Sequence, residues 1–150
     1  MARWLVKTEP GTYSWDDLAR EKSTVWDGVS NATALIHLRA MSKGDDVLIY
    51  HTGDEKAVVG TATVGANAYP DPKQDDERLV VVELKVGEKL ANPITLAQIK
   101  ADTAFKGFDL VRISRLSVMP VPEPMWNRIL ELGGNNPSAV QKPKKEARRR

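Results

Sequence analysis

Short apolar runs separated by turn-forming residues recur along most of the chain. Each run is five to eight residues long and rich in β-branched residues, a pattern that predicts a β-strand. The runs lie at residues 3–8, 47–51, 57–64, 79–84 and 116–121. Residues 69–76 are polar and contain two prolines, so we expect a loop between the third and fourth strands.

Four short helices are predicted by residues that cap helix ends. Ser14 and Asp17 have the spacing of a capping box, and Tyr13 stands where a side chain packs on the first turn. The same box recurs at Thr95 and Gln98. The helices are expected at residues 15–21, after a cap at Asn31 and before Gly44, at residues 96–101, and at residues 124–132.

Interspersed strands and short helices predict an α+β fold built on a small, mostly antiparallel barrel. A chain of 150 residues, 41% of them hydrophobic, suits one core. We therefore expect one domain over residues 1–134. Residues 135–150 are polar, proline-bearing and basic, so we expect them to form a disordered tail.

Charge is divided unevenly along the chain. Residues 142–150 carry six basic side chains and one acidic one, which gives +5, and the whole chain carries +2, so residues 1–141 carry −3. A globule of negative net charge does not attract polyanions by itself. Attraction to phosphate must therefore come from the tail or from a local cluster of cations.

Several classes of protein are disfavoured by what the sequence lacks. The chain has no cysteine, no apolar run near the about 20 residues that cross a bilayer, and no signal-peptide pattern. We expect a cytoplasmic protein with no membrane partner. The two histidines have no nearby cysteine or well-spaced carboxylate, and no phosphate-binding or dinucleotide-binding glycine motif is present. We expect neither a metal site nor a cofactor.

Trp26 is the strongest candidate for ligand binding. It precedes Asp27 and Gly28 in a segment with no helical or strand period, and Asn31 follows closely. An aromatic face beside hydrogen-bonding groups is what the recognition of an unstacked base requires. The alternative is a loop aromatic that packs on the core. For the other three tryptophans, core packing is the better explanation.

Three pairs of polar residues are further candidates. They are Tyr50 with His51 at a strand end, Lys7 with Glu9 in an extended segment, and Arg112 with Ser114, which alternate with apolar residues. Each pair has a plainer interpretation. A strand end is often simply solvated, a surface ion pair has little energetic value, and charges on an edge strand deter aggregation.

Many segments together resemble the EVE domain family of the PUA-like superfamily, over about residues 3–134. They are residues 4–10, 13–18, 26–29, 38–41, 44–45, 50–51, 59–60, 68–71, 110–118 and the helix around Trp126. The chain departs from this pattern beside Asn31. Ser30 and Ala32 stand where relatives often have an arginine and an aromatic residue, so this wall of the expected pocket is less basic and less aromatic.

The resemblance implies a PUA-like pseudobarrel with flanking short helices. It also implies that the protein binds a modified base in DNA or RNA by extruding it. We expect a monomeric, non-catalytic protein whose ligand is a single-stranded or flipped base. The residues expected around the base are Lys7, Trp26, Asp27, Asn31, Tyr50, His51, Arg112 and Ser114.

Two other functions stay open on the sequence alone. Some related ASCH proteins are hydrolases of modified nucleosides, and Lys7 near Glu9 could act as an activated amine or a base. Alternatively, the basic residues 142–150 could make the chain an interaction module that works through its tail.

Overall fold

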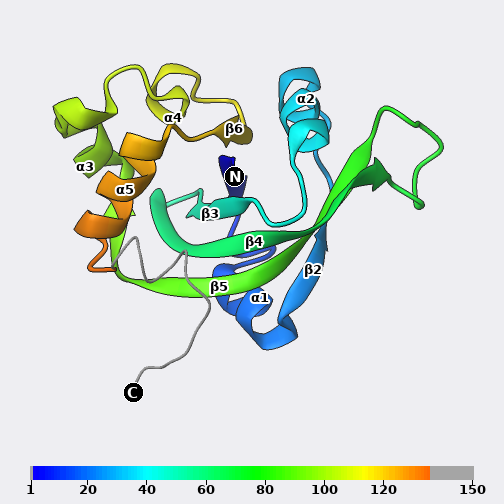
Figure 1. Cartoon of the computed structure of the whole chain (residues 1–150), viewed down its shortest axis with the longest axis horizontal. Coiled ribbons are helices and arrows are strands. Elements are labelled where there is room, and N and C mark those ends of the chain that lie inside the picture. Colours follow the sequence, from blue (N-terminus) through cyan, green and yellow to red (C-terminus); the bar gives the residue numbers. More distant parts are fainter. Residues whose placement is uncertain (1, 136–150) are drawn as a thin grey trace.

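Six strands form one sheet in the order β2-β5-β4-β3-β1-β6 (Figure 1). The computed structural model describes residues 2–135. The strands are β1 (Arg3–Thr8), β2 (Ser23–Trp26), β3 (Asp46–His51), β4 (Ala57–Pro70), β5 (Val80–Thr95) and β6 (Val118–Pro120). The helices are α1 (Trp15–Glu21), α2 (Ala32–Ala40), α3 (Leu96–Ala101), α4 (Asp109–Arg112) and α5 (Glu123–Leu132), with a short 3-10 turn η1 (Thr103–Phe105).

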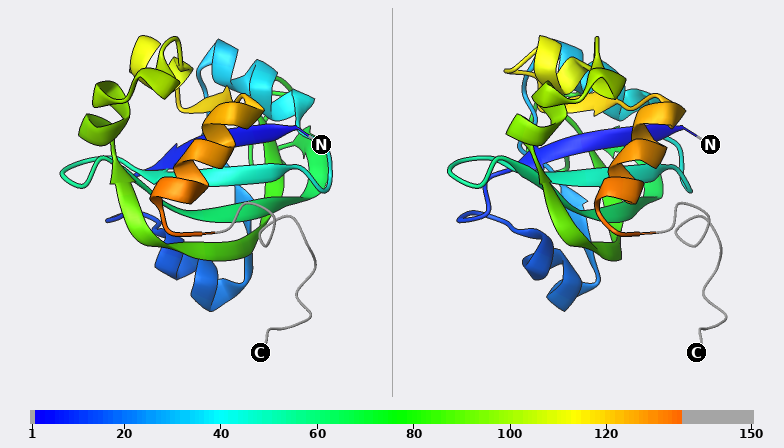
Figure 2. Two further views of the ribbon diagram at one scale, coloured as in Figure 1. Left: turned by 60° about the vertical axis from the view of Figure 1, so that its left-hand side comes forward. Right: turned by 90° about the vertical axis from the view of Figure 1, so that its left-hand side faces the viewer.

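The sheet is mostly antiparallel, and its one parallel pair joins β1 to β3. The predicted α+β class is therefore confirmed. The sheet curves strongly around the core, but it does not close into a barrel, because β2 and β6 are its two free edges (Figure 2). The expected barrel is thus an open, curved sheet.

The strands β4 and β5 are longer than their apolar runs predict. They span 14 and 16 residues, and several register shifts interrupt their pairing. Such bulges bend a strand and increase its twist. Pairing continues as far as Pro70 with Val80, so the loop expected at residues 69–76 begins only after Pro70. The hairpin of β4 and β5 projects beside α2 (Figure 1).

The predicted caps are confirmed at three helices. Ser14 and Thr95 each accept a hydrogen bond in a complete capping box, and α1 and α3 have the predicted bounds. The side chain of Asn31 accepts a hydrogen bond of 3.0 Å from the backbone N–H of Ala34 at the start of α2. These contacts are local in sequence, which is why the sequence predicts them well.

Two segments differ from the prediction. Trp26 ends the strand β2, paired with Val82 of β5, so it does not belong to the loop that follows. Arg112 ends the helix α4, where an extended segment was expected. This turn of helix forms because Leu110 packs in the core while Arg112 pairs with Asp109, three residues earlier, at 2.8 Å.

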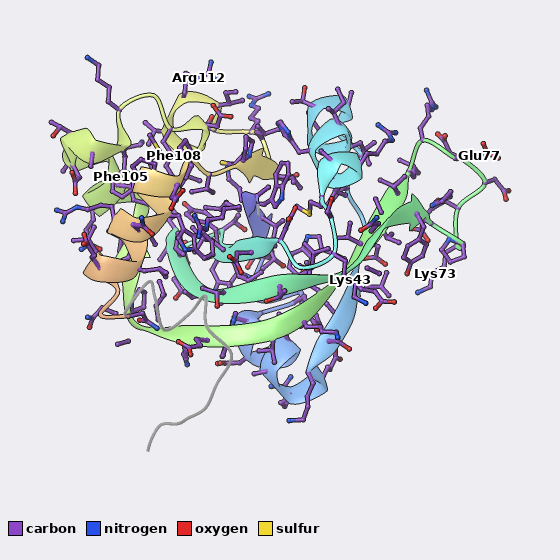
Figure 3. All side chains as sticks on the ribbon, in the orientation of Figure 1. Lys43, Lys73, Glu77, Phe105, Phe108 and Arg112 are labelled. Carbon is purple, nitrogen blue, oxygen red and sulfur yellow. The ribbon has the colours of Figure 1, made fainter. Side chains whose placement is uncertain are left out.

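The core lies between the concave face of the sheet and the helices α2 to α5, and α1 packs on the other side of β5 (Figure 1). Trp126 of α5 is fully buried, and the rings of Phe105 and Phe108 stack at 6.0 Å beneath the helices at one end (Figure 3). At the other end, α2 lies beside the β4–β5 hairpin (Figure 1). None of the helices in residues 2–135 has both the length and the apolar surface needed to cross a bilayer.

The expected tail falls almost entirely outside the described residues. Only Asn135 of that segment is described, and it belongs to the end of the folded domain. Its backbone N–H donates to the carbonyl of Leu130 at 2.8 Å, and its side-chain oxygen accepts from the N–H of Ala91 at 3.2 Å.

The helix α1 is fixed to the sheet through Trp15. Its backbone N–H donates to Nε2 of His51 at 3.0 Å, and its indole Nε1 donates to the carbonyl of Thr61 at 3.0 Å. Gly60 makes room for the indole, because a Cβ at this position would lie 2.4 Å from Nε1. This contact sets the position of the segment that leads from β1 into α1.

Replacing Gly60 with alanine is therefore expected to push Trp15 off the sheet. The overpacking should lower the free energy of unfolding by about 1–3 kcal/mol, measured by urea denaturation. Gly65→Ala is the matched control in the same strand, since its Cβ would meet the flexible side chain of Lys85 at 3.2 Å and the Cβ of Glu83 at an ordinary contact distance of 3.6 Å. Equal stability losses in the two variants would contradict this account of the packing.

Candidate functional site

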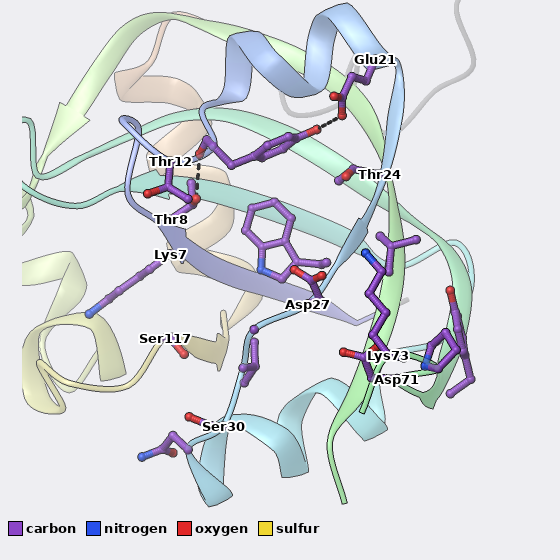
Figure 4. Close-up of a pocket in the computed structure, with 18 residues that line it drawn as sticks. Lys7, Thr8, Thr12, Glu21, Thr24, Asp27, Ser30, Asp71, Lys73 and Ser117 are labelled. Atoms are coloured by element: carbon purple, nitrogen blue, oxygen red, sulfur yellow. Dashed lines mark hydrogen bonds between the residues drawn. The ribbon is translucent and has the colours of Figure 1, made fainter. Parts of the chain in front are cut away.

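A cavity of about 800 Å³ opens beside β2, at the end of the molecule away from α5 (Figure 4). Its walls come from β1, the segment before α1, β2, the loop between β2 and α2, and the β4–β5 hairpin. We call it the Trp26 pocket. Its lining residues are Lys7, Thr8, Thr12, Tyr13, Glu21, Thr24, Val25, Trp26, Asp27, Gly28, Val29, Ser30, Asn31, Tyr69, Asp71, Pro72, Lys73 and Ser117.

Trp26 is the largest aromatic residue that lines this pocket. Its side chain packs in the core and leaves only 8% of the residue exposed. The ring of Tyr13 meets the indole edge-on, with centroids 6.0 Å apart and planes at 83°. The indole Nε1 makes no hydrogen bond with any described residue, so it remains available as a donor. Trp26 is thus both a core residue and the border of a cavity.

Tyr13 is held rigidly above the indole. Its hydroxyl donates to Oε1 of Glu21 at 2.6 Å, and its carbonyl accepts from the hydroxyl of Thr8 at 2.7 Å. Burial, followed by the hydrogen bond to Glu21, raises the pKa of Tyr13 above its usual value. The sequence assigns Tyr13 only to packing at the start of α1, so its place in the pocket is a finding of the structure.

Asp27 and Asn31 supply polar groups to the same pocket. Asp27 is exposed, and its carboxylate makes no hydrogen bond or ion pair with the described residues. Gly28 follows with a φ of 79°, a conformation that glycine adopts without strain and that turns the chain toward α2. Asn31 uses its side-chain oxygen to cap α2, which leaves its amide NH₂ as a donor for a ligand.

Lys7 lines the pocket from β1 and points away from the indole, toward the segment between α4 and β6 (Figure 4). Its Nζ donates to the carbonyl of Ser114 at 2.8 Å and lies 5.7 Å from the ring centroid of Tyr50. Burial lowers the pKa of Lys7 below that of an ordinary lysine. No carboxylate within the described part of the chain forms an ion pair with it.

The other four predicted site residues do not line the pocket. Tyr50 is buried beneath Lys7, and His51 accepts from Trp15 while its Nδ1 contacts Glu55 at 2.8 Å. Arg112 lies far from the hairpin residue Lys73 (Figure 3). Ser114 contributes only its carbonyl, to Lys7. A direct role of these four in ligand binding stays a prediction.

The hairpin between β4 and β5 forms a wall that the sequence did not assign to the site. Tyr69, Asp71, Pro72 and Lys73 border the pocket there. The carboxylate of Asp71 accepts from the backbone N–H of Lys73 at 2.9 Å, which is an Asx-turn that shapes the loop. The prolines and aspartates of this segment predict a turn, but nothing local shows that it folds against Trp26.

The pocket combines an aromatic wall with donors and acceptors that have no partner among residues 2–135. Such a surface suits a flat ligand with a polar edge. Within residues 2–135, no group of three or more histidine or acidic side chains is arranged to hold a metal ion.

Comparison with known proteins shows the family. The EVE domain model matches residues 2–132. A solved structure from Rhodopseudomonas palustris is 38% identical, with a TM-score of 0.85 and coverage of 89% of this chain and 94% of that one.

Human thymocyte nuclear protein 1 is 26% identical over 91% of this chain and 76% of its own length. A structure of human THYN1 in complex with 5-methylcytosine-containing DNA has a TM-score of 0.82 at 27% identity, covering 91% of this chain and 100% of that one. The family model covers almost all described residues, the solved relatives share the fold, and the chain belongs to the EVE domain family.

Proposed function

We propose that the protein binds one modified, unpaired or flipped nucleobase of DNA or RNA in the Trp26 pocket, without converting it chemically. The observation that carries this proposal is the cavity beside the indole, bordered by the unpartnered carboxylate of Asp27. The human relative solved with 5-methylcytosine-containing DNA supports the same class of ligand.

The size of the pocket suits a nucleotide. Cavities that bind small ligands measure roughly 300–1,000 Å³, and this one measures about 800 Å³. Lys7 and Lys73 line it at separate places (Figure 4). A base against Trp26 therefore leaves a cation within the same pocket for a phosphate or sugar oxygen.

Energetics favour a base that is already unpaired. Extruding a base from a duplex costs a few kcal/mol, while one good aromatic stack returns about 1–3 kcal/mol. Trp26 is largely buried, so its stack is partial and does not exceed that cost. Single strands, mismatches and damaged sites are therefore better ligands than intact duplex.

Recognition of the base requires its hydrogen-bonding edge as well as its face. One methyl group adds only about 0.8 kcal/mol of apolar burial, which is near fourfold in affinity. The carboxylate of Asp27 accepts hydrogen bonds and donates none, so it fits the exocyclic amine of cytosine or adenine and disfavours the carbonyl at the same position of uracil or thymine. We therefore expect an amino-bearing base in the pocket.

Replacing Trp26 with leucine removes the aromatic wall and keeps apolar bulk in the core. Affinity for the mononucleotide of 5-methylcytosine is expected to fall by about fivefold or more, measured by titration calorimetry, because the stack is lost. Trp126→Leu is the matched control, since it removes a buried tryptophan that does not line the pocket. Circular dichroism confirms that each variant is folded. Unchanged affinity in folded Trp26→Leu would refute the role of the indole.

Replacing Asp27 with asparagine keeps the shape of the side chain and adds an N–H donor. The preference for cytosine over uracil mononucleotides is expected to fall by about tenfold, since a hydrogen-bonded base edge contributes roughly 1–3 kcal/mol of discrimination. Asp54→Asn, an exposed aspartate outside the pocket, is the control. Calorimetry with both nucleotides measures the ratio, and an unchanged ratio would show that Asp27 does not contact the base.

A further inference from the structure

A second hollow of about 510 Å³ lies between α2 and the β4–β5 hairpin, and it shares Ser30 with the Trp26 pocket. We call it the α2–hairpin groove. It is lined by Ser30, Ala32, Leu35, Ile36, Arg39, Asp76, Arg78 and Leu79. The two cavities therefore meet at the loop that joins β2 to α2.

The groove has an exposed apolar surface. Ile36 is 60% exposed, although it lies on a helix whose other large apolar residues are buried. The half-buried Leu79 of the hairpin borders the groove beside Ile36, and the buried Leu35 forms part of its floor. A single exposed apolar side chain is ordinary on a protein surface, so Ile36 matters here because it lies in a hollow beside the guanidinium of Arg39.

Arg39 supplies a cation that carboxylates do not neutralise. Its Nη2 donates to the carbonyl of Arg78 at 2.6 Å, which holds the guanidinium between helix and hairpin, and it forms no ion pair within the described part of the chain. Asp76 is occupied by Arg78 through two side-chain hydrogen bonds of 3.0 and 2.8 Å. The hydrogen bonds from Arg78 lower the pKa of Asp76 to about 2, so this pair is neutral as a whole.

We propose that the α2–hairpin groove binds the nucleotide adjacent to the one in the Trp26 pocket, on the same strand. This inference rests on the proposed function. A strand that places one base against Trp26 continues past Ser30, because the two cavities share that residue. The next base would then lie on Ile36 and on the planar guanidinium of Arg39, a group on which bases stack well.

Such a contact would add the affinity that the largely buried indole cannot provide. One base stacked on an aromatic side chain strengthens binding by roughly five- to 150-fold, and we expect the aliphatic and guanidinium surface of the groove to give the lower end of this range. Aliphatic and guanidinium surfaces contact any base, so the groove would strengthen binding without reading the sequence next to the modified base. The strand is thus the occupant that the shared residue and the free cation favour.

The test compares two ligands by titration calorimetry. One is the mononucleotide of 5-methylcytosine, and the other is a DNA trinucleotide with 5-methylcytosine between two thymidines. The trinucleotide is expected to bind at least about fivefold more tightly. Arg39→Gln and Ile36→Ser, both at exposed positions, should each reduce this gain by about threefold and leave mononucleotide affinity unchanged. Lys100→Gln is the control, because it removes an exposed cation from α3, outside both cavities.

Two results would overturn the inference. The first is a trinucleotide that binds no better than the mononucleotide. The second is a gain that survives in both Arg39→Gln and Ile36→Ser, which would leave the groove to another occupant such as a protein partner. A different result would contradict the proposed function itself. In that case Trp26→Leu would bind both the mononucleotide and the trinucleotide as tightly as the unchanged protein does.

Discussion

The pairing of β2 with β5 fixes the indole around which the candidate site is built. Trp26 lies opposite Val82, and side chains of neighbouring residues in a strand point to opposite faces of a sheet. A shift of one residue in this pairing would move the indole to the opposite face of the sheet and put the exposed Val25 in the buried position that Trp26 now occupies. Trp26 also packs in the core, so the contacts that stabilise the fold also hold the indole in its place at the pocket.

Local contacts explain which parts of the structure the sequence predicts well. The capping boxes at Ser14 and Thr95 involve residues three positions apart, and the helices that follow them have the predicted bounds. The strand β2 was missed because Ser23–Trp26 is short and forms only by pairing with β5, about 60 residues later. The turn of helix at Asp109–Arg112 was missed because burial of Leu110 outweighs the alternating pattern.

The sequence likewise predicts only part of the site. Four of the eight predicted residues, Lys7, Trp26, Asp27 and Asn31, line one cavity. The remaining four are polar residues close to these in sequence or in space, and several have structural contacts instead, as His51 does with α1. The hairpin wall around Lys73 could not be predicted, because it reaches the pocket only through the long, bent pairing of β4 with β5.

The double attachment of α1 to the sheet has a consequence for ligand choice. Trp15 ties the helix to His51 and to the carbonyl of Thr61, and Tyr13 is held against Trp26 by its own hydrogen bonds. This side of the cavity is therefore fixed by several contacts to the sheet and to α1. On the proposed function, added volume on a base is more easily accommodated by the opposite loop of residues 71–79, which lines the cavity through Asp71, Pro72 and Lys73. Changes in that loop, with the tryptophan kept, are the simplest route by which a related protein would come to accept a larger chemical group.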